Sequence, residues 1–337
     1  MSSAPTPDEI ARDATWLAQA LDPSQGVVRL IAMDRYSYRA ESFLDDRMLR
    51  QTVDAQIVPW TLIEAAVSGG MRSDARWIFH IGHVGSTLLS RLLGELDGVV
   101  SLREPRLLRD LALSPAAVRE GYIDAAPKLM SRSFADDETA CVKATSFVSE
   151  IAPELVPSGE RALFMYAAPT SYIAGILAGE NSVKELRVLA DTRAARMAGR
   201  VTALEPAPSS NAQLAAAAWA CEMTSLESAA ERMPDRPIVW LEFDRMLADV
   251  PAALRMVTDH FAFDADEIAI EAIASGPLMG RYSKAPEFDY SPALRRALIG
   301  QTEREHGAEI DSALAMLRSA AEKSPLLARA LARAGEA

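Results

Sequence analysis

The sequence predicts an α/β fold, a three-layer sandwich in which helices cover both faces of a central parallel sheet of about five strands. After residue 75, five short apolar runs alternate with segments of helical periodicity. Several runs are rich in aromatic or β-branched residues, and they are shorter than buried helices usually are. Runs of this kind, alternating with helices, are typical of buried parallel strands. The five runs are Trp77–Ile81, Val99–Leu102, Ala140–Lys143, Ala162–Tyr166 and Ile238–Phe243.

The chain divides into two predicted parts, 1–73 and 74–337. Helical signals over Asp8–Leu21 and Ala40–Gln51, followed by the Gly69-Gly70 break, predict that the first part is a helical extension. Within the second part, a mostly helical region covers about 181–232, and further helices follow at the C-terminal end of the sequence.

Composition excludes several classes of function. Lys and Arg number 35 against 47 Asp and Glu, a net charge of −12, which argues against binding to nucleic acid or to an anionic membrane surface. No apolar run approaches the length that spans a bilayer, and the start of the chain is polar and acidic, unlike a signal peptide. A cytoplasmic location is therefore expected. The two cysteines and four histidines lack zinc-site spacing, so no metal site is expected.

The strongest motif is a glycine loop between the first apolar run and a helix. The run ends in His80–Thr87, and leucines with helical spacing follow immediately. Gly82 and Gly85 allow a tight turn, so the amides of the next residues point outward from the positive end of a helix, a geometry that binds phosphate. A plain turn capped by Ser86 or Thr87 is the alternative. A Walker A loop would require glycine at His80 and lysine at Ser86, which weakens assignment to the ATP-hydrolysing class.

In this loop the sequence resembles the sulfotransferase superfamily, and the resemblance extends from Arg76 to Arg296. Bacterial members carry P-R-S-G-T-T-L-L here, and the loop binds the 5′-phosphosulfate end of 3′-phosphoadenosine 5′-phosphosulfate. The matching run in this chain is Gly82–Leu89. The resemblance implies a P-loop sulfotransferase-like domain that binds this donor nucleotide without a metal. The implied donor-binding residues of the loop are Gly82, His83, Gly85, Ser86 and Thr87.

Other segments match the superfamily in the same order. Ser101–Pro105 resembles the segment that carries a catalytic carboxylate, here Glu104. Cys141–Thr145 resembles the strand end whose lysine, here Lys143, stabilises the transferring group. Trp240–Asp249 resembles a Y-E-D-L segment of the family. Gly280–Lys284 resembles the late basic loop that folds over the cofactor, which implies donor contacts from Arg281 and Lys284.

One segment departs from the family pattern. Ala167 and Gly175 stand where members place an arginine and a serine that bind the donor's 3′-phosphate. The arginine's paired hydrogen bonds to that phosphate are thereby lost. Either another base, such as Arg281, Lys284 or Arg187, reaches the phosphate, or the donor is a different nucleotide.

The chemistry of these residues favours transfer of a sulfuryl group to a hydroxyl or amine acceptor. Such a transfer requires a base for the acceptor and positive charge around the leaving oxygens. Glu104 is the candidate base, although a glutamate before proline also suits a helix start. Lys143 and His83 are the candidate electrostatic groups. The partners expected are a nucleotide donor and an acceptor bound by the region 181–232, whose identity the sequence leaves open. The alternatives are an atypical kinase-like phosphotransferase and a non-catalytic nucleotide-binding protein.

Overall fold

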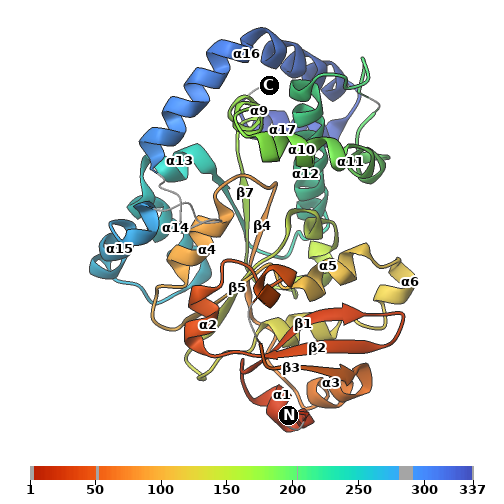
Figure 1. Ribbon diagram of the computed structural model, residues 1–337, viewed down its shortest axis with the longest axis vertical. Helices are drawn as coiled ribbons and strands as arrows, with labels where there is room; N and C mark the ends of the chain where they lie inside the picture. Colours follow the sequence, from red (N-terminus) through yellow and green to blue (C-terminus); the bar gives the residue numbers. More distant parts are fainter. Residues whose placement is uncertain (1–3, 51–52, 203, 281–290, 336–337) are drawn as a thin grey trace.

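A computed structural model of the chain describes residues 4–50, 53–202, 204–280 and 291–335. Its centre is a five-stranded parallel sheet in the order β5-β6-β4-β7-β8 (Figure 1). The strands coincide with the five predicted apolar runs to within a residue at either end. They are β4 (Arg76–His80), β5 (Val99–Arg103), β6 (Thr139–Lys143), β7 (Ala162–Tyr166) and β8 (Ile238–Glu242).

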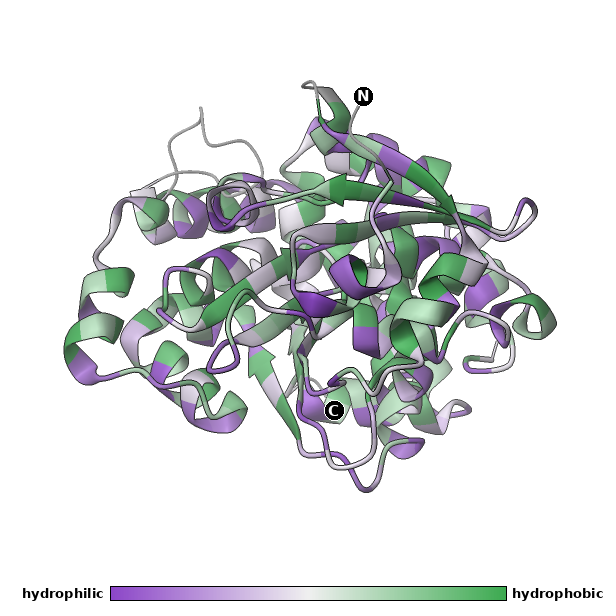
Figure 2. Cartoon of the chain, turned by 90° about the horizontal axis from the view of Figure 1, so that it is seen from below, coloured by the Kyte–Doolittle hydropathy of each residue, from purple (hydrophilic) through white to green (hydrophobic). Residues whose placement is uncertain are grey.

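Helices flank this sheet, so the predicted α/β class is confirmed. In Figure 1, α4 lies to the left of the strands, against β5 and β6, and the long α12 lies to the right and contacts β4. The strands are largely hydrophobic in Figure 2, whereas the helices carry hydrophilic and hydrophobic residues on successive positions, the pattern of elements with one buried face. In four of the strands nearly every residue is buried: all of β5 and β7, and β4 and β6 from their second residue.

The helices of the main part follow each strand in turn. After β4 comes α4 (Ser86–Leu93); after β5 come α5 (Arg106–Leu113), α6 (Ala116–Arg119) and α7 (Ala125–Met130); after β6 come η2 (Ser146–Ile151) and α8 (Ala152–Leu155). After β7 come α9 (Pro169–Leu177), α10 (Glu180–Val188), α11 (Ala190–Met197) and α12 (Asn211–Glu231). After β8 come α13 (Phe243–Ala248), α14 (Val250–Phe261), α15 (Glu267–Ala274), η3 (Pro277–Gly280), α16 (Pro292–Ala321) and α17 (Pro325–Arg333).

The N-terminal part differs from the predicted helical extension. It contains an antiparallel sheet in the order β1-β2-β3, and the helices around that sheet are short. Its elements are α1 (Pro7–Arg12), β1 (Trp16–Asp22), β2 (Val27–Ala32), α2 (Arg35–Ala40), η1 (Asp46–Arg50), β3 (Ala55–Pro59) and α3 (Trp60–Val67).

The helical prediction for residues 8–21 was wrong beyond the first turns because the alanines and leucines of β1 are good helix formers. Its five central residues are all buried, and Gln19 interrupts the apolar run, so the segment matches neither an alternating nor a continuously apolar strand. A turn with Gly26 at φ +63° then joins β1 to β2. The prediction for 40–51 was also wrong, because only the 3₁₀ turn at Asp46–Arg50 is helical after α2 ends. The division of the chain at residue 73 stays a prediction.

A buried arginine connects the N-terminal part to the central sheet. Arg103 is the last residue of β5 and is 1% exposed. Its guanidinium donates hydrogen bonds to the carbonyl of Glu41, at 2.9 and 2.7 Å, and to the carbonyl of Tyr38. Its own carbonyl accepts from the amide of Leu44 at 2.7 Å. Burial lowers the pKa of Arg103 to about 10, which leaves the side chain protonated at neutral pH.

We expect Arg103→Met to destabilise the protein by roughly 1–3 kcal/mol, because two buried carbonyl oxygens lose their donor while the side-chain volume is largely kept. The measurement is urea unfolding followed by circular dichroism. Arg106→Met is the matched control, since that partly exposed arginine pairs with Asp46 and Asp110 and should contribute about 0–1 kcal/mol. Equal losses in the two variants would contradict the anchoring role of Arg103.

Candidate functional site

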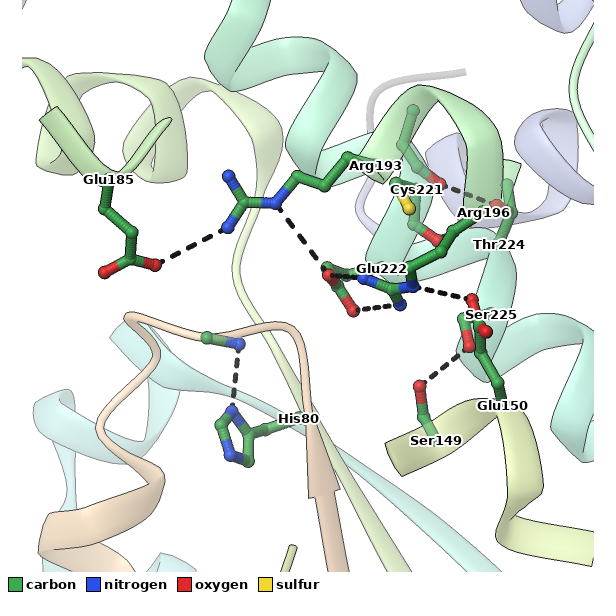
Figure 3. Close-up of polar contacts among 12 residues, drawn as sticks. His80, Ser149, Glu150, Glu185, Arg193, Arg196, Cys221, Glu222, Thr224 and Ser225 are labelled. Atoms are coloured by element: carbon green, nitrogen blue, oxygen red, sulfur yellow. Dashed lines mark hydrogen bonds and ion pairs between the residues drawn. The ribbon is translucent and has the colours of Figure 1, made fainter. Parts of the chain in front are cut away.

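The glycine loop joins β4 to α4 and has the backbone that the sequence predicts. Gly82 and Gly85 have φ of +79° and +65°, and His83 between them has φ of +54°. The loop is fixed from below by His80. Its Nδ1 accepts from the amide of Gly82 at 2.9 Å (Figure 3), and its Nε2 contacts the carbonyl of Ala144 at 2.9 Å. Because Nδ1 accepts and Nε2 faces a carbonyl, His80 fits the neutral tautomer protonated at Nε2.

Gly85 is the N-cap of α4, and two constraints require glycine there. Its positive φ disfavours any residue with a Cβ. A Cβ built on it would also overlap the ring of Phe243, the first residue of α13. As a glycine, the N-cap residue supplies no side-chain hydrogen bond to the first amides of α4. Free amides at the positive end of a helix bind anions.

Lys143 and Glu104 lie beside the start of α4. Lys143 ends β6 and is completely buried, and its Nζ donates to Thr87 Oγ1 at 3.2 Å and pairs with Glu104 Oε1. Glu104 follows β5, and its amide donates to the carbonyl of Lys143 at 2.7 Å. The structure thus brings Thr87, Lys143 and Glu104 together at the carboxyl edge of three adjacent strands, the edge where α/β sheets bind ligands.

Glu104 has a backbone conformation that is rare for its residue type. Its φ is +55°, a left-handed geometry that costs about 1–3 kcal/mol and persists only where surrounding contacts enforce it. The contacts here are the amide bond to Lys143 and the ion pair with the Lys143 side chain. These contacts direct the carboxylate to the Lys143 ammonium, which itself donates to Thr87 in the first turn of α4.

A cavity of about 410 Å³ opens at the start of α4, between α9 and α16. Of the predicted loop residues, His83, Gly85, Ser86 and Thr87 line it and Gly82 does not. The other lining residues come from later segments of the chain. They are Val84, Leu88, Ser171, Tyr172, Gly175, Ala178, Gly179, Ser182, Phe243, Leu294, Arg295, Leu298 and Ile299.

Arg295 is a cavity residue that the sequence analysis did not identify. It lies on α16, pairs with Asp244, and its guanidinium carbon is 4.4 Å from the centre of the Phe243 ring. Two residues of the same helix, Leu294 and Leu298, line the cavity while 59% and 48% exposed. No local motif marks these residues, because about 200 residues separate them from the loop and only the packing of α16 on α9 brings them to it.

Three cations were proposed from the sequence to reach the donor's 3′-phosphate, namely Arg187, Arg281 and Lys284. Arg187 donates to the side-chain oxygen of Asn211 at 3.1 Å and does not line the cavity. Arg281 and Lys284 lie outside the described residues. Gly175 lines the cavity, and the carbonyl of buried Ala167 accepts from the indole of Trp219 at 2.9 Å. Arg295 and His83 are the basic side chains that line the cavity among described residues.

An ion-pair network fixes the helical region 181–232 next to the loop (Figure 3). Glu222 of α12 is 2% exposed and accepts from Arg196 at 2.7 and 3.1 Å. Arg193 lies between Glu222 and Glu185, whose carboxylate is 3.8 Å from the His83 ring. Buried charges of this kind are stable only when paired, so α10, α11 and α12 hold a fixed position relative to the loop.

Two further observations bear on the predicted absences. Within the described ranges, no three His, Cys, Asp or Glu side chains are grouped as a metal site would require. None of the helices in the described part of the chain has the length and hydropathy to cross a membrane. Both cysteines are buried, and burial raises the pKa of each thiol to about 12.

We expect Gly85→Ala to weaken anion binding at the loop at least tenfold, because the added methyl group displaces either Phe243 or the first turn of α4. Isothermal titration with sulfate and with 3′-phosphoadenosine 5′-phosphate measures the loss. Gly82→Ala is the control, because its φ is equally strained but the nearest atom to its Cβ, Ser146 Oγ, is 4.0 Å away. Unchanged binding in Gly85→Ala would show that the loop is only a turn.

Comparison with known proteins gives matches among solved structures only. No protein-family model matches the sequence, and neither does any curated protein. The sulfotransferase domain from the curacin biosynthetic pathway is 12% identical, with a TM-score of 0.41 over 69% of this chain and 91% of that domain. The sulfotransferase domain of the Synechococcus PCC 7002 olefin synthase is 15% identical, with a TM-score of 0.39 over 68% and 86%. Mouse sulfotransferase SULT7A1, solved in complex with PAP, is 10% identical, with a TM-score of 0.41 over 82% and 93%.

Proposed function

We propose that this protein transfers a sulfuryl group from 3′-phosphoadenosine 5′-phosphosulfate to a hydroxyl or amine acceptor. The observation that carries the proposal is the meeting of a glycine-capped helix N-terminus, a buried lysine and a carboxylate at one edge of the sheet. Thr87, Lys143 and Glu104 come from three separate segments, and each supplies a different requirement of the reaction.

The glycine loop and Lys143 would stabilise the negative charge that the transfer places on oxygen. The amides of Gly85, Ser86 and Thr87 stand at the positive end of α4, and Ser86 and Thr87 add hydroxyl donors. Lys143 contacts the Thr87 hydroxyl, so its ammonium lies beside the same anion site. Because Lys143 is completely buried, its charge acts with little screening by water. These groups would neutralise the oxygens around the transferring sulfur and the departing phosphate.

Proton transfer falls to Glu104. The donor supplies an activated sulfuryl group, and the acceptor oxygen or nitrogen forms a bond to its sulfur while the bond from sulfur to the 5′-phosphate oxygen breaks. Glu104 takes the proton that the acceptor loses, and the nucleoside 3′,5′-bisphosphate leaves with the electron pair of the broken bond. The ion pair with Lys143 favours the carboxylate form, which is the form able to accept that proton.

The cavity beside the loop fits the rest of the donor. Gly175 of α9 and Gly179, the N-cap of α10, line it together with Leu294 and Leu298 of α16, and such a small and apolar lining suits a flat ring. Among the described residues that line the cavity, Arg295 is the arginine. We assign it to the 3′-phosphate, in place of the family's arginine that is missing at Ala167. Arg281 and Lys284 remain proposed contacts from the neighbouring segment.

Replacement of the proposed base should separate catalysis from binding. We expect Glu104→Gln to reduce sulfuryl transfer by 10²–10⁴-fold while the affinity for 3′-phosphoadenosine 5′-phosphate stays within threefold, because the carboxylate acts on the acceptor. Transfer of ³⁵S from labelled donor to a panel of hydroxyl and amine acceptors measures the rate, with and without magnesium. Transfer that requires ATP and magnesium would favour the kinase-like alternative, and nucleotide binding without turnover would favour the non-catalytic one.

Assignment of Arg295 to the 3′-phosphate predicts a nucleotide preference. The wild-type protein should bind 3′-phosphoadenosine 5′-phosphate tenfold to a hundredfold more tightly than adenosine 5′-phosphate, since a charged hydrogen bond contributes about 1.5–3 kcal/mol. Arg295→Ala should remove this preference, whereas exposed Arg296→Ala on the same helix should keep it. Equal affinities of the wild-type protein for both nucleotides would overturn the assignment of the donor.

A further inference from the structure

We propose that Arg47, in the N-terminal part of the chain, is a positioning residue that holds the Glu104 carboxylate ionised and oriented for proton transfer. This inference rests on the proposed function, because it concerns the same carboxylate. It assigns to the N-terminal part a direct role in the active site that neither the glycine loop nor the family motifs indicate.

Arg47 lies directly on Glu104. Its Nη2 donates to Glu104 Oε2 at 2.9 Å, while Lys143 pairs with the other carboxylate oxygen, Oε1. The same guanidinium forms a two-pronged pair with Asp45, with Nε to Oδ1 at 2.8 Å and Nη2 to Oδ2 at 2.6 Å. Its carbon stands 3.3 Å from the centre of the Phe43 ring. Arg47 is therefore fixed in direction on three sides.

The segment that carries Arg47 is held in place independently of this contact. Leu44 donates to the carbonyl of Arg103, and the Gln19 side chain of β1 donates to the carbonyl of Leu44 at 3.3 Å. Together with the Arg103 hydrogen bonds to Tyr38 and Glu41, these contacts dock residues 38–44 onto the end of β5. Glu104 is the next residue after β5, so these contacts place Arg47 beside it.

Exposure distinguishes Arg47 from the other charged groups of the cluster. The side chains of Lys143, Asp45 and Glu104 are 1%, 7% and 11% exposed, whereas that of Arg47 is 43% exposed. Arg47 thus covers Glu104 on the side that solvent reaches. Both carboxylates that Arg47 pairs with, Asp45 and Glu104, are buried, so Arg47 is the charged residue of this cluster that lies nearest to solvent.

The electrostatic effect has a defined direction. In the described part of the chain, the charged groups that face Glu104 are Lys143 from β6 and Arg47 from the N-terminal segment, with Asp45 behind Arg47. Arg103 points to the opposite side, toward Tyr38 and Glu41, and Arg106 pairs with Asp46 and Asp110. Each adjacent cation favours the ionised carboxylate, so loss of Arg47 makes Glu104 protonate at a higher pH.

The test titrates Glu104 without requiring turnover. The full chain is labelled with ¹³C at glutamate carboxyls, and the Glu104 signal is assigned as the one missing in Glu104→Gln. We expect Arg47→Gln to raise the Glu104 midpoint by about one pH unit or more and Arg47→Lys to restore part of the difference. Arg29→Gln is the matched control, because Arg29 contacts Asp46 and Gln19 but not Glu104, and it should leave the midpoint unchanged.

An unchanged Glu104 midpoint in Arg47→Gln, with the fold retained by circular dichroism, overturns the inference. A shift shared by Arg29→Gln overturns it as well, because the effect would then come from general surface charge. Where transfer is measurable, the acidic limb of the plot of kcat/KM against pH should shift to higher pH in Arg47→Gln. The shift should equal the change in the Glu104 midpoint. A wild-type protein that binds no donor nucleotide and transfers no sulfuryl group refutes the proposed function, and the midpoints still decide whether Arg47 controls the charge of Glu104.

Discussion

The ion pair between Lys143 and Glu104 is the interaction on which the arrangement of the site depends. Lys143 is completely buried, so its ammonium requires a carboxylate within reach, and Glu104 adopts a left-handed backbone to supply one. The amide of Glu104 also bonds the carbonyl of Lys143, which joins the ends of β5 and β6 through both backbone and side chain. Thr87 attaches the start of α4 to this pair. Two strands and one helix therefore share a single polar centre.

Gly85 fixes the start of α4, the helix that contributes Thr87 to this polar centre. The loop must turn sharply enough to direct the amides of α4 away from the sheet, and Phe243 packs so closely that no side chain fits there. The Phe243 ring in turn packs against the Arg295 guanidinium of α16, and both residues line the cavity. A constraint on one backbone position thus connects the sheet edge to a helix some two hundred residues later in the chain.

The N-terminal part contributes charge rather than additional strands to the central sheet. Its own antiparallel sheet stays separate, and its connection to β5 passes through the buried Arg103. Because that connection fixes residues 38–44, the next few residues lie beside Glu104, where Phe43 and Arg47 stack on each other. The carboxylate then has a cation on each oxygen, one buried and one facing solvent.

Much of the fold could be predicted from the sequence because buried parallel strands leave a local signal. Runs such as Ala162–Tyr166 are apolar at every position, so their place in the chain and their type followed without knowledge of their neighbours. The glycine loop could also be predicted, because an apolar strand, two glycines and an amphipathic helix occur in direct succession. Lys143 and Glu104 became candidates because they match segments of the sulfotransferase pattern at the ends of predicted strands, and the ends of parallel strands share an edge. Strand β1 was missed because its alanines and leucines are good helix formers and Gln19 interrupts the apolar run, so it matches neither an alternating nor a continuously apolar strand. Arg47, Arg295 and the leucines of α16 could not be found from the sequence, because their positions depend on contacts between segments far apart in the chain. A local pattern determines which elements form, whereas the packing of those elements on one another decides which charges meet.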